Sequence, residues 1–148
     1  MYPYHYYRQL NLPRVPDDIL AQINLDPKDY TKTLRLTHDV YTWTDQFNEA
    51  INSWCQENIC KEMYWAFQFM TGDLPIHKDN VTLNKFVYVI EPGGLNVVTS
   101  FYTEDHSTQL ESIVLETHKW YILKVDTPHD VSGIEPGKLR FAITSRIF

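Results

Sequence analysis

Short apolar runs separated by turn residues dominate the chain beyond residue 60. The runs are rich in Val, Ile, Phe, Tyr and Trp, and Gly, Pro and Asp cluster between them, which is the pattern of β-strands joined by short turns. They predict strands over residues 63–71, 74–77, 83–91, 96–103, 112–116, 120–125, 128–133 and 139–147. About eight short strands in one unit favour a sandwich, a barrel or a jelly roll.

The first 60 residues follow a different periodicity, which predicts two helices. One spans residues 16–24 and the other spans residues 44–57. In the second helix Phe47, Ile51 and Trp54 fall on one face. Each helix carries one apolar stripe, so we expect both to cover one sheet of the β-core.

A single domain over residues 1–148 accommodates both parts of the chain. Residues 1–60 then form a helical and extended support, and residues 61–148 form the β-core. No repeat, low-complexity segment or linker divides the two. The longest polar connection, residues 103–112, is predicted to be a loop at the rim of the core.

Composition and charge narrow the class of protein. The 148 residues are 43% hydrophobic and 14% aromatic, which is enough to fill one core. Lys and Arg number 13 against 19 Asp and Glu, and no basic stripe is present, so we expect no nucleic-acid partner. No apolar run approaches a membrane span, so we expect no membrane partner. Cys55 and Cys60 lack the spacing of a zinc or CxxC motif and suit a reducing compartment, which predicts a cytoplasmic protein.

The stretch LPIHKDN, residues 74–80, contains the first candidate for chemistry. His77 and Asp79 lie two positions apart on a predicted strand, so their side chains share one face and could bind one ion. The chain has six histidines, and the alternative is a surface histidine that happens to lie beside a turn aspartate. Lys78 should point to the opposite face and be solvated.

A third ligand is needed to turn this pair into a catalytic metal site, because such sites use about three protein ligands and leave positions open. His129 is the best candidate: it follows the apolar strand WYILKV, and a jelly roll can bring distant strands side by side. His106 lies in the polar loop and His118 in a hairpin-like turn. We interpret both of these as solvated histidines.

Arg140 opens the last apolar strand, shortly after His129. Alternation places Arg140 on the same side as Ala142 and Thr144, a small-residue face that suits the lining of a cavity. A buried arginine needs an anion, and its planar guanidinium fits a carboxylate. The alternative is a salt bridge to one of the acidic residues of the chain.

The HxD pair, the distal histidine and the arginine soon after it resemble the motif of the 2-oxoglutarate and Fe(II)-dependent oxygenases, in particular prolyl-hydroxylase-like members. The likeness runs from about residue 64 to the C-terminus, over WAFQFMTGDLPIHKD, LNKFVYVIEPGG, TSFY, YILKVDTPHDVSG and LRFAITSRIF. It implies a double-stranded β-helix, which is a cupin-like jelly roll. It also implies that His77, Asp79 and His129 bind Fe(II) and that Arg140 holds the distal carboxylate of 2-oxoglutarate.

Two further residues are carried over from the family, and one position departs from it. Prolyl-hydroxylase-like members use a Thr four residues after the Arg and a Tyr on the strand after HxD for the same carboxylate, and Thr144 and Tyr88 hold these positions here. Tyr88 would then face inward; an ordinary core tyrosine is the alternative. Many members carry Ser or Thr two positions after the Arg, where this chain has Ala142.

The resemblance implies a dioxygenase that uses Fe(II), 2-oxoglutarate and O2, releases succinate and CO2, and hydroxylates its substrate. A prolyl or other amino-acid side chain of a peptide is the expected substrate, with a small metabolite as the alternative. Two other functions stay open. Two His and one Asp also suit Zn²⁺, as in a zinc-dependent hydrolase on a cupin-like fold, and the chain could be a non-catalytic jelly-roll binding module. The sequence does not indicate an oligomeric state.

Overall fold

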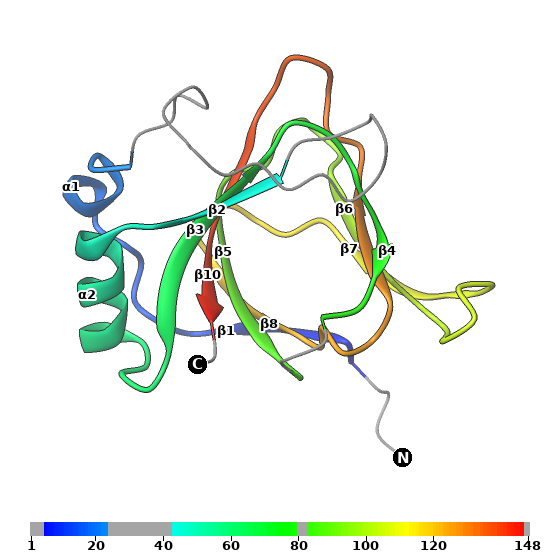
Figure 1. Cartoon of the computed structure of the whole chain (residues 1–148), viewed down its shortest axis with the longest axis horizontal. Coiled ribbons are helices and arrows are strands. Elements are labelled where there is room, and N and C mark those ends of the chain that lie inside the picture. Colours follow the sequence, from blue (N-terminus) through cyan, green and yellow to red (C-terminus); the bar gives the residue numbers. More distant parts are fainter. Residues whose placement is uncertain (1–4, 24–42, 80–82, 147–148) are drawn as a thin grey trace.

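Two antiparallel β-sheets face each other, and both helices lie outside one of them (Figure 1). The structure is a computed structural model that describes residues 5–23, 43–79 and 83–146. Its elements are β1 (Tyr7–Leu10), α1 (Asp17–Leu20), β2 (Trp43–Phe47), α2 (Glu49–Asn58), β3 (Tyr64–Met70), β4 (Leu74–His77), β5 (Lys85–Glu91), β6 (Val98–Tyr102), β7 (Gln109–Ile113), β8 (Trp120–Leu123), β9 (His129–Ser132) and β10 (Arg140–Arg146).

The order of the strands identifies the fold as a jelly roll. The larger sheet has the order β1-β8-β5-β10-β3-β2, and the smaller has the order β4-β9-β6-β7. From β3 to β10 the chain therefore contributes four strands to each sheet and crosses between the sheets repeatedly. This is the double-stranded β-helix that the sequence predicted, with the helices packed on one sheet.

The N-terminal part contributes strands as well as helices, which the sequence did not predict. Residues 44–47, predicted as the first turn of a helix, belong to β2, an edge strand that pairs with β3 with Phe47 opposite Ala66. Helix α2 begins only at Glu49, after Asn48, whose side chain accepts a hydrogen bond from the Ile51 amide. The prediction was wrong there because pairing with a distant strand overrides local helical spacing.

Two more boundaries differ from the predicted ones. Strand β7, Gln109–Ile113, occupies the end of the segment predicted as a polar loop. Helix α1 covers only Asp17–Leu20 of the predicted 16–24, and residue 24 lies outside the described residues. In addition, β1 pairs with β8 at the other edge of the larger sheet.

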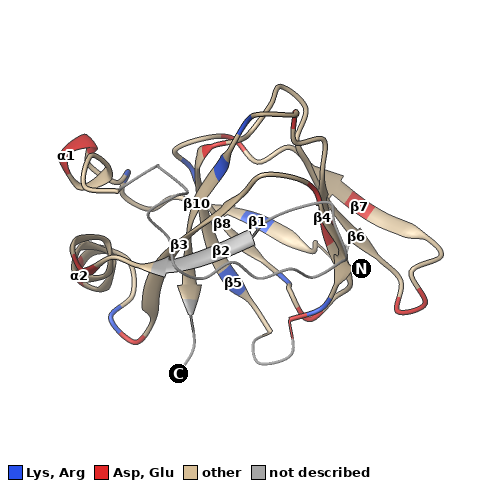
Figure 2. Ribbon diagram, turned by 45° about the horizontal axis from the view of Figure 1, so that its top comes forward, with Lys and Arg blue, Asp and Glu red and all other residues tan. Residues whose placement is uncertain are grey.

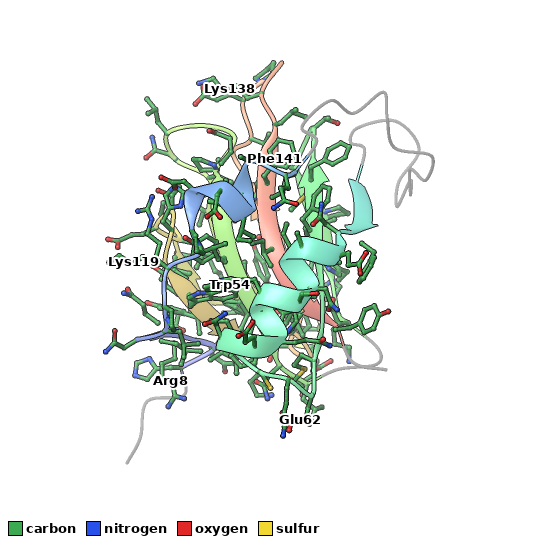
Figure 3. The ribbon with its side chains drawn as sticks, turned by 90° about the vertical axis from the view of Figure 1, so that its left-hand side faces the viewer. Arg8, Trp54, Glu62, Lys119, Lys138 and Phe141 are labelled. Atoms are coloured by element: carbon green, nitrogen blue, oxygen red, sulfur yellow. The ribbon has the colours of Figure 1, made fainter. Side chains whose placement is uncertain are left out.

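Helix α2 covers the outer face of the larger sheet, as Figure 3 shows from that side. Ile51 is fully buried against a core that includes Trp65 of β3 and Phe141 of β10. The helix is also tied to β3 by a buried hydrogen bond of 2.8 Å, in which the Trp65 amide donates to the Asn52 side chain. This layer holds β3 and β10 in place and so fixes one wall of the interior.

A second apolar cluster fills the space between the sheets. Val87 and Val89 of β5, Ala142 of β10 and Phe101 of β6 meet there. Tyr6 stacks on Phe101 with the ring centroids 5.6 Å apart, so this part of the tyrosine-rich N-terminus packs on the core. A charged side chain in this apolar interior is therefore unusual and needs an explanation.

Charged residues are distributed over many elements, and Figure 2 shows Lys and Arg spread over several strands and loops. The absence of a nucleic-acid partner remains a prediction. Among the described residues, neither helix has the length and apolarity that crossing a membrane requires.

Candidate metal centre

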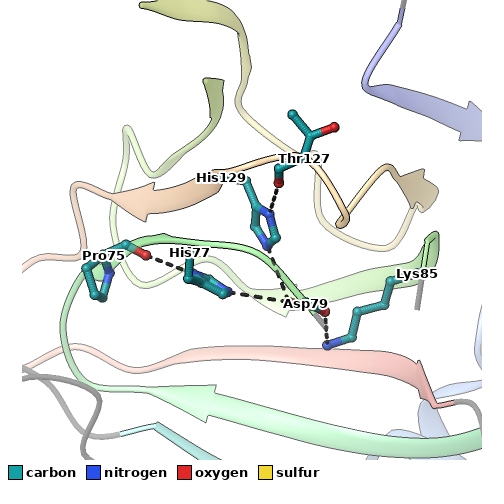
Figure 4. A network of polar contacts seen from close by, with 6 residues as sticks. All are labelled: Pro75, His77, Asp79, Lys85, Thr127 and His129. Carbon is teal, nitrogen blue, oxygen red and sulfur yellow. Dashed lines mark hydrogen bonds and ion pairs between the residues drawn. The ribbon is translucent and has the colours of Figure 1, made fainter. Parts of the chain in front are cut away.

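His77 and His129 lie opposite each other on neighbouring strands of the smaller sheet. They end β4 and begin β9, and the antiparallel register pairs the two residues directly, so their side chains share a face. The Asp79 amide donates to the Val125 carbonyl at 2.9 Å, which fixes the chain just beyond β4. Figure 4 shows the three side chains converging on one point.

The three side chains are close enough to hold one ion. Oδ1 of Asp79 lies 3.5 Å from Nε2 of His77 and 3.7 Å from Nε2 of His129. One ligand atom from each residue falls within 4.8 Å of the others, and the imidazole centroids are 4.4 Å apart. The predicted grouping of these residues is therefore present as a cluster.

Backbone carbonyls orient both imidazole rings. Nδ1 of His77 lies 2.8 Å from the Pro75 carbonyl oxygen, and Nδ1 of His129 lies 2.7 Å from the Thr127 carbonyl oxygen. A carbonyl oxygen can only accept, so each Nδ1 carries the hydrogen and each neutral ring has a free lone pair on Nε2. Those are the atoms that face Asp79. Fixing a ligand histidine through its other nitrogen is the usual support of a metal site.

The protonation states also suit a cation. Burial lowers the pKa of His129 to about 4, so this ring is neutral near pH 7. Burial acts most strongly on the pKa of His77 and lowers it, but the bonds with Asp79 and the Pro75 carbonyl and the charge of Asp79 together outweigh burial, so the pKa is raised and the Asp79 carboxylate favours a proton on Nε2 of His77. Burial acts to raise the pKa of Asp79, yet the bond with His77 and the charge of Lys85 lower it overall, so Asp79 is ionised. Metal ligands must be deprotonated, so His129 and Asp79 are already in the state that binds a metal, whereas a metal would displace the proton that Asp79 favours on His77.

Two lysines flank the cluster in different ways. Lys78 is exposed and its Nζ pairs with Glu104 at 2.9 Å, so it faces away from the cluster as predicted. Lys85, which the sequence interpretation missed, is buried, and its Nζ lies 4.0 Å from Oδ2 of Asp79. Lys85 alternates in register with Val87 and Val89, both of which face the interior, but apolar residues on both faces of β5 hide this in the sequence.

Arg140 is a buried cation that faces the space between the sheets. Its side chain lies on the side of β10 shared by Met70, its partner on β3, and Met70 packs with Leu74 and Val131 of the smaller sheet. Arg140 is 3% exposed, and burial lowers its pKa to about 10. Its Nη1 donates to the Pro92 carbonyl at 3.3 Å. Among the described residues it forms no ion pair, so the salt-bridge alternative finds no support there.

The turn at Pro92 and Gly93 packs against Arg140. Gly93, next to Pro92, has a φ of 85°, and a Cβ placed on it would lie 3.2 Å from Cβ of Arg140. The close approach therefore requires glycine at this position.

Thr144 shares the inward face of β10 with Arg140. It is fully buried, and its Oγ1 has no hydrogen-bond partner among the described residues. A buried hydroxyl without a partner costs free energy, so a ligand in the interior would relieve it. Ala142, between the two, contributes only a methyl group to the apolar cluster.

Tyr88 does not have the inward orientation predicted for it. Its ring belongs to the core under the helices, 4.8 Å from the Trp120 ring, on the face of β5 opposite to Val87. Its hydroxyl accepts from the Val15 amide at 3.2 Å and contacts Nδ1 of His118 at 3.3 Å. It is a core tyrosine with a satisfied hydroxyl, which was the alternative.

The other two histidines considered as ligands lie away from the cluster. His118 was predicted to be solvated, but its Nδ1 contacts the Tyr88 hydroxyl. It also lines a separate cavity of about 610 Å³ beside β1 and β8. His106 is exposed in the turn after β6. The site thus has two nitrogen donors and one carboxylate, a set suited to Fe(II) and also to Zn²⁺.

Comparison with known proteins supports the fold alone. No family model and no curated protein matches the sequence. Fe(II)-HppE with the alternative substrate (S)-1-HPP is similar, with a TM-score of 0.50, 11% identity, and coverage of 86% of this chain and 61% of that chain. The hydroxypropylphosphonic acid epoxidase from S. wedmorenis in complex with fosfomycin has a TM-score of 0.43 and 11% identity. The match covers 86% of this chain and 60% of that chain. An RmlC-like cupin protein from Desulfovibrio desulfuricans has a TM-score of 0.39 and 13% identity. The match covers 82% of this chain and 96% of that chain. The chain spans about three fifths of the length of HppE.

Proposed function

We propose that the protein is an Fe(II)- and 2-oxoglutarate-dependent dioxygenase. The observation that carries the proposal is the presence, in one jelly roll, of a His-Asp-His cluster and a buried arginine without an acidic partner among the described residues. The cluster supplies metal ligands, and the arginine calls for an anionic ligand in the same interior. A zinc hydrolase needs the first feature, and it needs the second only where its substrate carries an anionic group.

His77, Asp79 and His129 would hold the metal through their Nε2 atoms and Oδ1. Bound Fe(II) would supply the redox centre that couples oxidation of a 2-oxo acid by O2 to oxidation of a substrate C–H bond. Pro75 and Thr127 keep both histidines in the tautomer that presents Nε2. Preorganisation of this kind is what allows three ligands to bind while other positions remain for the cosubstrate.

Arg140 and Thr144 would bind the carboxylate of 2-oxoglutarate that lies farther from the metal. The guanidinium offers paired donors, and the Thr144 hydroxyl lacks a partner among the described residues. Ala142 removes a hydroxyl that many related enzymes carry, so Arg140 bears a larger share of the binding. The substrate itself would be an amino-acid side chain of a peptide, or a small metabolite.

A second candidate is an Fe(II) oxidase that uses no 2-oxo acid. The likeness to Fe(II)-HppE, although it reaches only the level of the fold, suggests it. In that case Arg140 would hold an anionic group of the substrate itself. The two candidates differ in one product, succinate.

Formation of succinate in air tests the proposal. With Fe(II), ascorbate and 2-oxoglutarate, we expect slow succinate release that rises when a prolyl peptide, free amino acid or other true substrate is added. His129→Ala, with one ligand removed, is expected to release none. Metal-dependent turnover without succinate would favour the oxidase. Zn²⁺-dependent hydrolysis that survives in Arg140→Ala would favour the hydrolase, and no turnover together with no metal binding would favour a non-catalytic module.

A further inference from the structure

Lys85 is a charged residue at an interior position. It opens β5 on the face that carries Val87 and Val89 between the sheets, and its side chain is 10% exposed. Lysine is rarely buried to this extent unless it has a partner, because removing an ammonium from water is costly. The ammonium group of Lys85 therefore needs a partner on the face of β5 that lies between the sheets.

The ammonium meets the carboxylate of the metal cluster from the opposite sheet. Its Nζ lies 4.0 Å from Oδ2 of Asp79, whereas Oδ1 of Asp79 faces the Nε2 atoms of the two histidines. The two oxygens of one carboxylate are thus divided between two tasks (Figure 4). Asp79 follows β4 of the smaller sheet and Lys85 begins β5 of the larger, so the pair also bridges the sheets.

We propose that Lys85 is a positioning residue of the metal centre. By engaging Oδ2, it keeps the Asp79 carboxylate turned so that Oδ1 points between His77 and His129. Among the described residues, the two imidazoles are the other groups that contact the Asp79 carboxylate. The inference rests on the proposed function in so far as the cluster binds a metal, and it adds a residue that the family motif does not include.

Two opposing effects decide what removal of Lys85 does. An ammonium near a divalent cation repels it, so its loss by itself would strengthen metal binding. Loss of the contact that orients a ligand weakens binding, typically by 10- to 100-fold for an outer partner of a metal site. The carboxylate lies between the ammonium and the cluster and offsets the repulsion, so we expect the orienting effect to dominate.

Binding of Mn(II), a redox-stable substitute for Fe(II), tests the proposal. Mn(II) affinity is measured by electron paramagnetic resonance on the full chain, alongside urea unfolding of the metal-free protein. We expect Lys85→Met to bind Mn(II) roughly 10- to 100-fold more weakly. The urea unfolding curve shows whether the variant is folded, because removing one partner of a buried ion pair lowers stability. Lys85→Arg, which keeps a cation that can reach Oδ2, is expected to recover most of the affinity.

Lys78→Met is the matched control, because Lys78 lies between the same ligands but pairs with Glu104 on the surface. It should bind Mn(II) like the wild type. Equal or tighter binding by Lys85→Met overturns the inference, as does a Lys85→Arg variant as weak as Lys85→Met. If Lys85→Met does not fold, Lys85→Gln takes its place with the same expectation. A wild type that binds no Mn(II) defeats the proposed function instead, so the two failures are distinct.

Discussion

Arg140→Met is expected to abolish useful binding of 2-oxoglutarate while leaving the metal site intact. The guanidinium is 3% exposed, so its bond with a carboxylate would form away from water. Removing one partner of a buried charge pair costs about 2–5 kcal/mol, or roughly 30-fold to several thousand-fold in affinity. Mn(II) should still bind normally, because Arg140 is not part of the cluster.

The same substitution is expected to maintain or raise the stability of the ligand-free protein. Burial lowers the pKa of Arg140 from 12.5 to about 10, which at 1.36 kcal/mol per pKa unit corresponds to roughly 3 kcal/mol against the charged form on folding. The pKa of a basic group is lowered here, so this cost is present at every pH below about 10. Methionine fills similar space without the charge, as in other buried ion replacements.

Urea unfolding with and without 2-oxoglutarate and Mn(II) measures both effects. We expect 2-oxoglutarate to stabilise the wild type but not Arg140→Met. Lys138→Met is the control. Lys138 lies two positions before Arg140, but its side chain is half-exposed and pairs with Glu135. A ligand-free Arg140→Met that is clearly less stable than the wild type would mean that the arginine has an internal anionic partner, which contradicts the account.

His129→Ala is expected to remove metal binding almost completely. His129 is one of the three proposed ligands and is buried, so water would replace it only poorly. The loss should exceed about 100-fold, the upper range for outer partners of metal sites. A metal at 100 times its Kd raises stability by about 2.7 kcal/mol, and the variant should lose this increment.

The metal-induced shift in unfolding is the measurement, because the substitution itself also opens a cavity. Each variant is compared with its own metal-free form by thermal unfolding. His118→Ala is the matched control: His118 is partly buried, but it bonds Tyr88 away from the cluster. A shift in His129→Ala as large as that in the wild type would show that the ion binds elsewhere.

The cluster could be predicted from sequence because two simple features of a jelly roll place its residues. Side chains alternate along a strand, and strands distant in the sequence lie side by side. Period two predicted that His77 and Asp79 share a face. In the structure Asp79 lies just beyond β4, fixed by the hydrogen bond that its amide donates to Val125, and the register of β4 and β9 sets His129 directly opposite His77. The strands predicted over residues 63–71, 74–77 and 83–91, where apolar runs end in turns, match β3, β4 and β5 within two residues. The order of strands came from the family resemblance, since pattern alone allowed a sandwich, a barrel or a jelly roll.

The orientation of Tyr88 and the role of Lys85 were missed for one reason. Strand β5 is buried on both faces, one under the helices and one between the sheets, so apolar residues occupy both alternating sets. Hydrophobicity then cannot tell the inward face from the outward one. Only the three-dimensional pairing of β5 with β10 distinguishes them.

The missed strands have different causes. Strand β7 was predicted three residues too late, over residues 112–116, because it is an edge strand with mostly exposed side chains and lacks the apolar signal on which a sequence prediction depends. Strand β2 precedes α2 so closely that Phe47 fits the helical spacing of Ile51 and Trp54. Both are settled by partners distant in the sequence.

Anaerobic titration with Fe(II) and 2-oxoglutarate tests the central claim most directly. A 2-oxo acid chelated to Fe(II) gives a visible charge-transfer band. We expect the band in the wild type only when both components are present, saturating at one equivalent of each, and we expect it to be absent from His129→Ala and to need far more 2-oxoglutarate in Arg140→Met. A wild type that binds Fe(II) but develops no band at saturating 2-oxoglutarate would contradict the account.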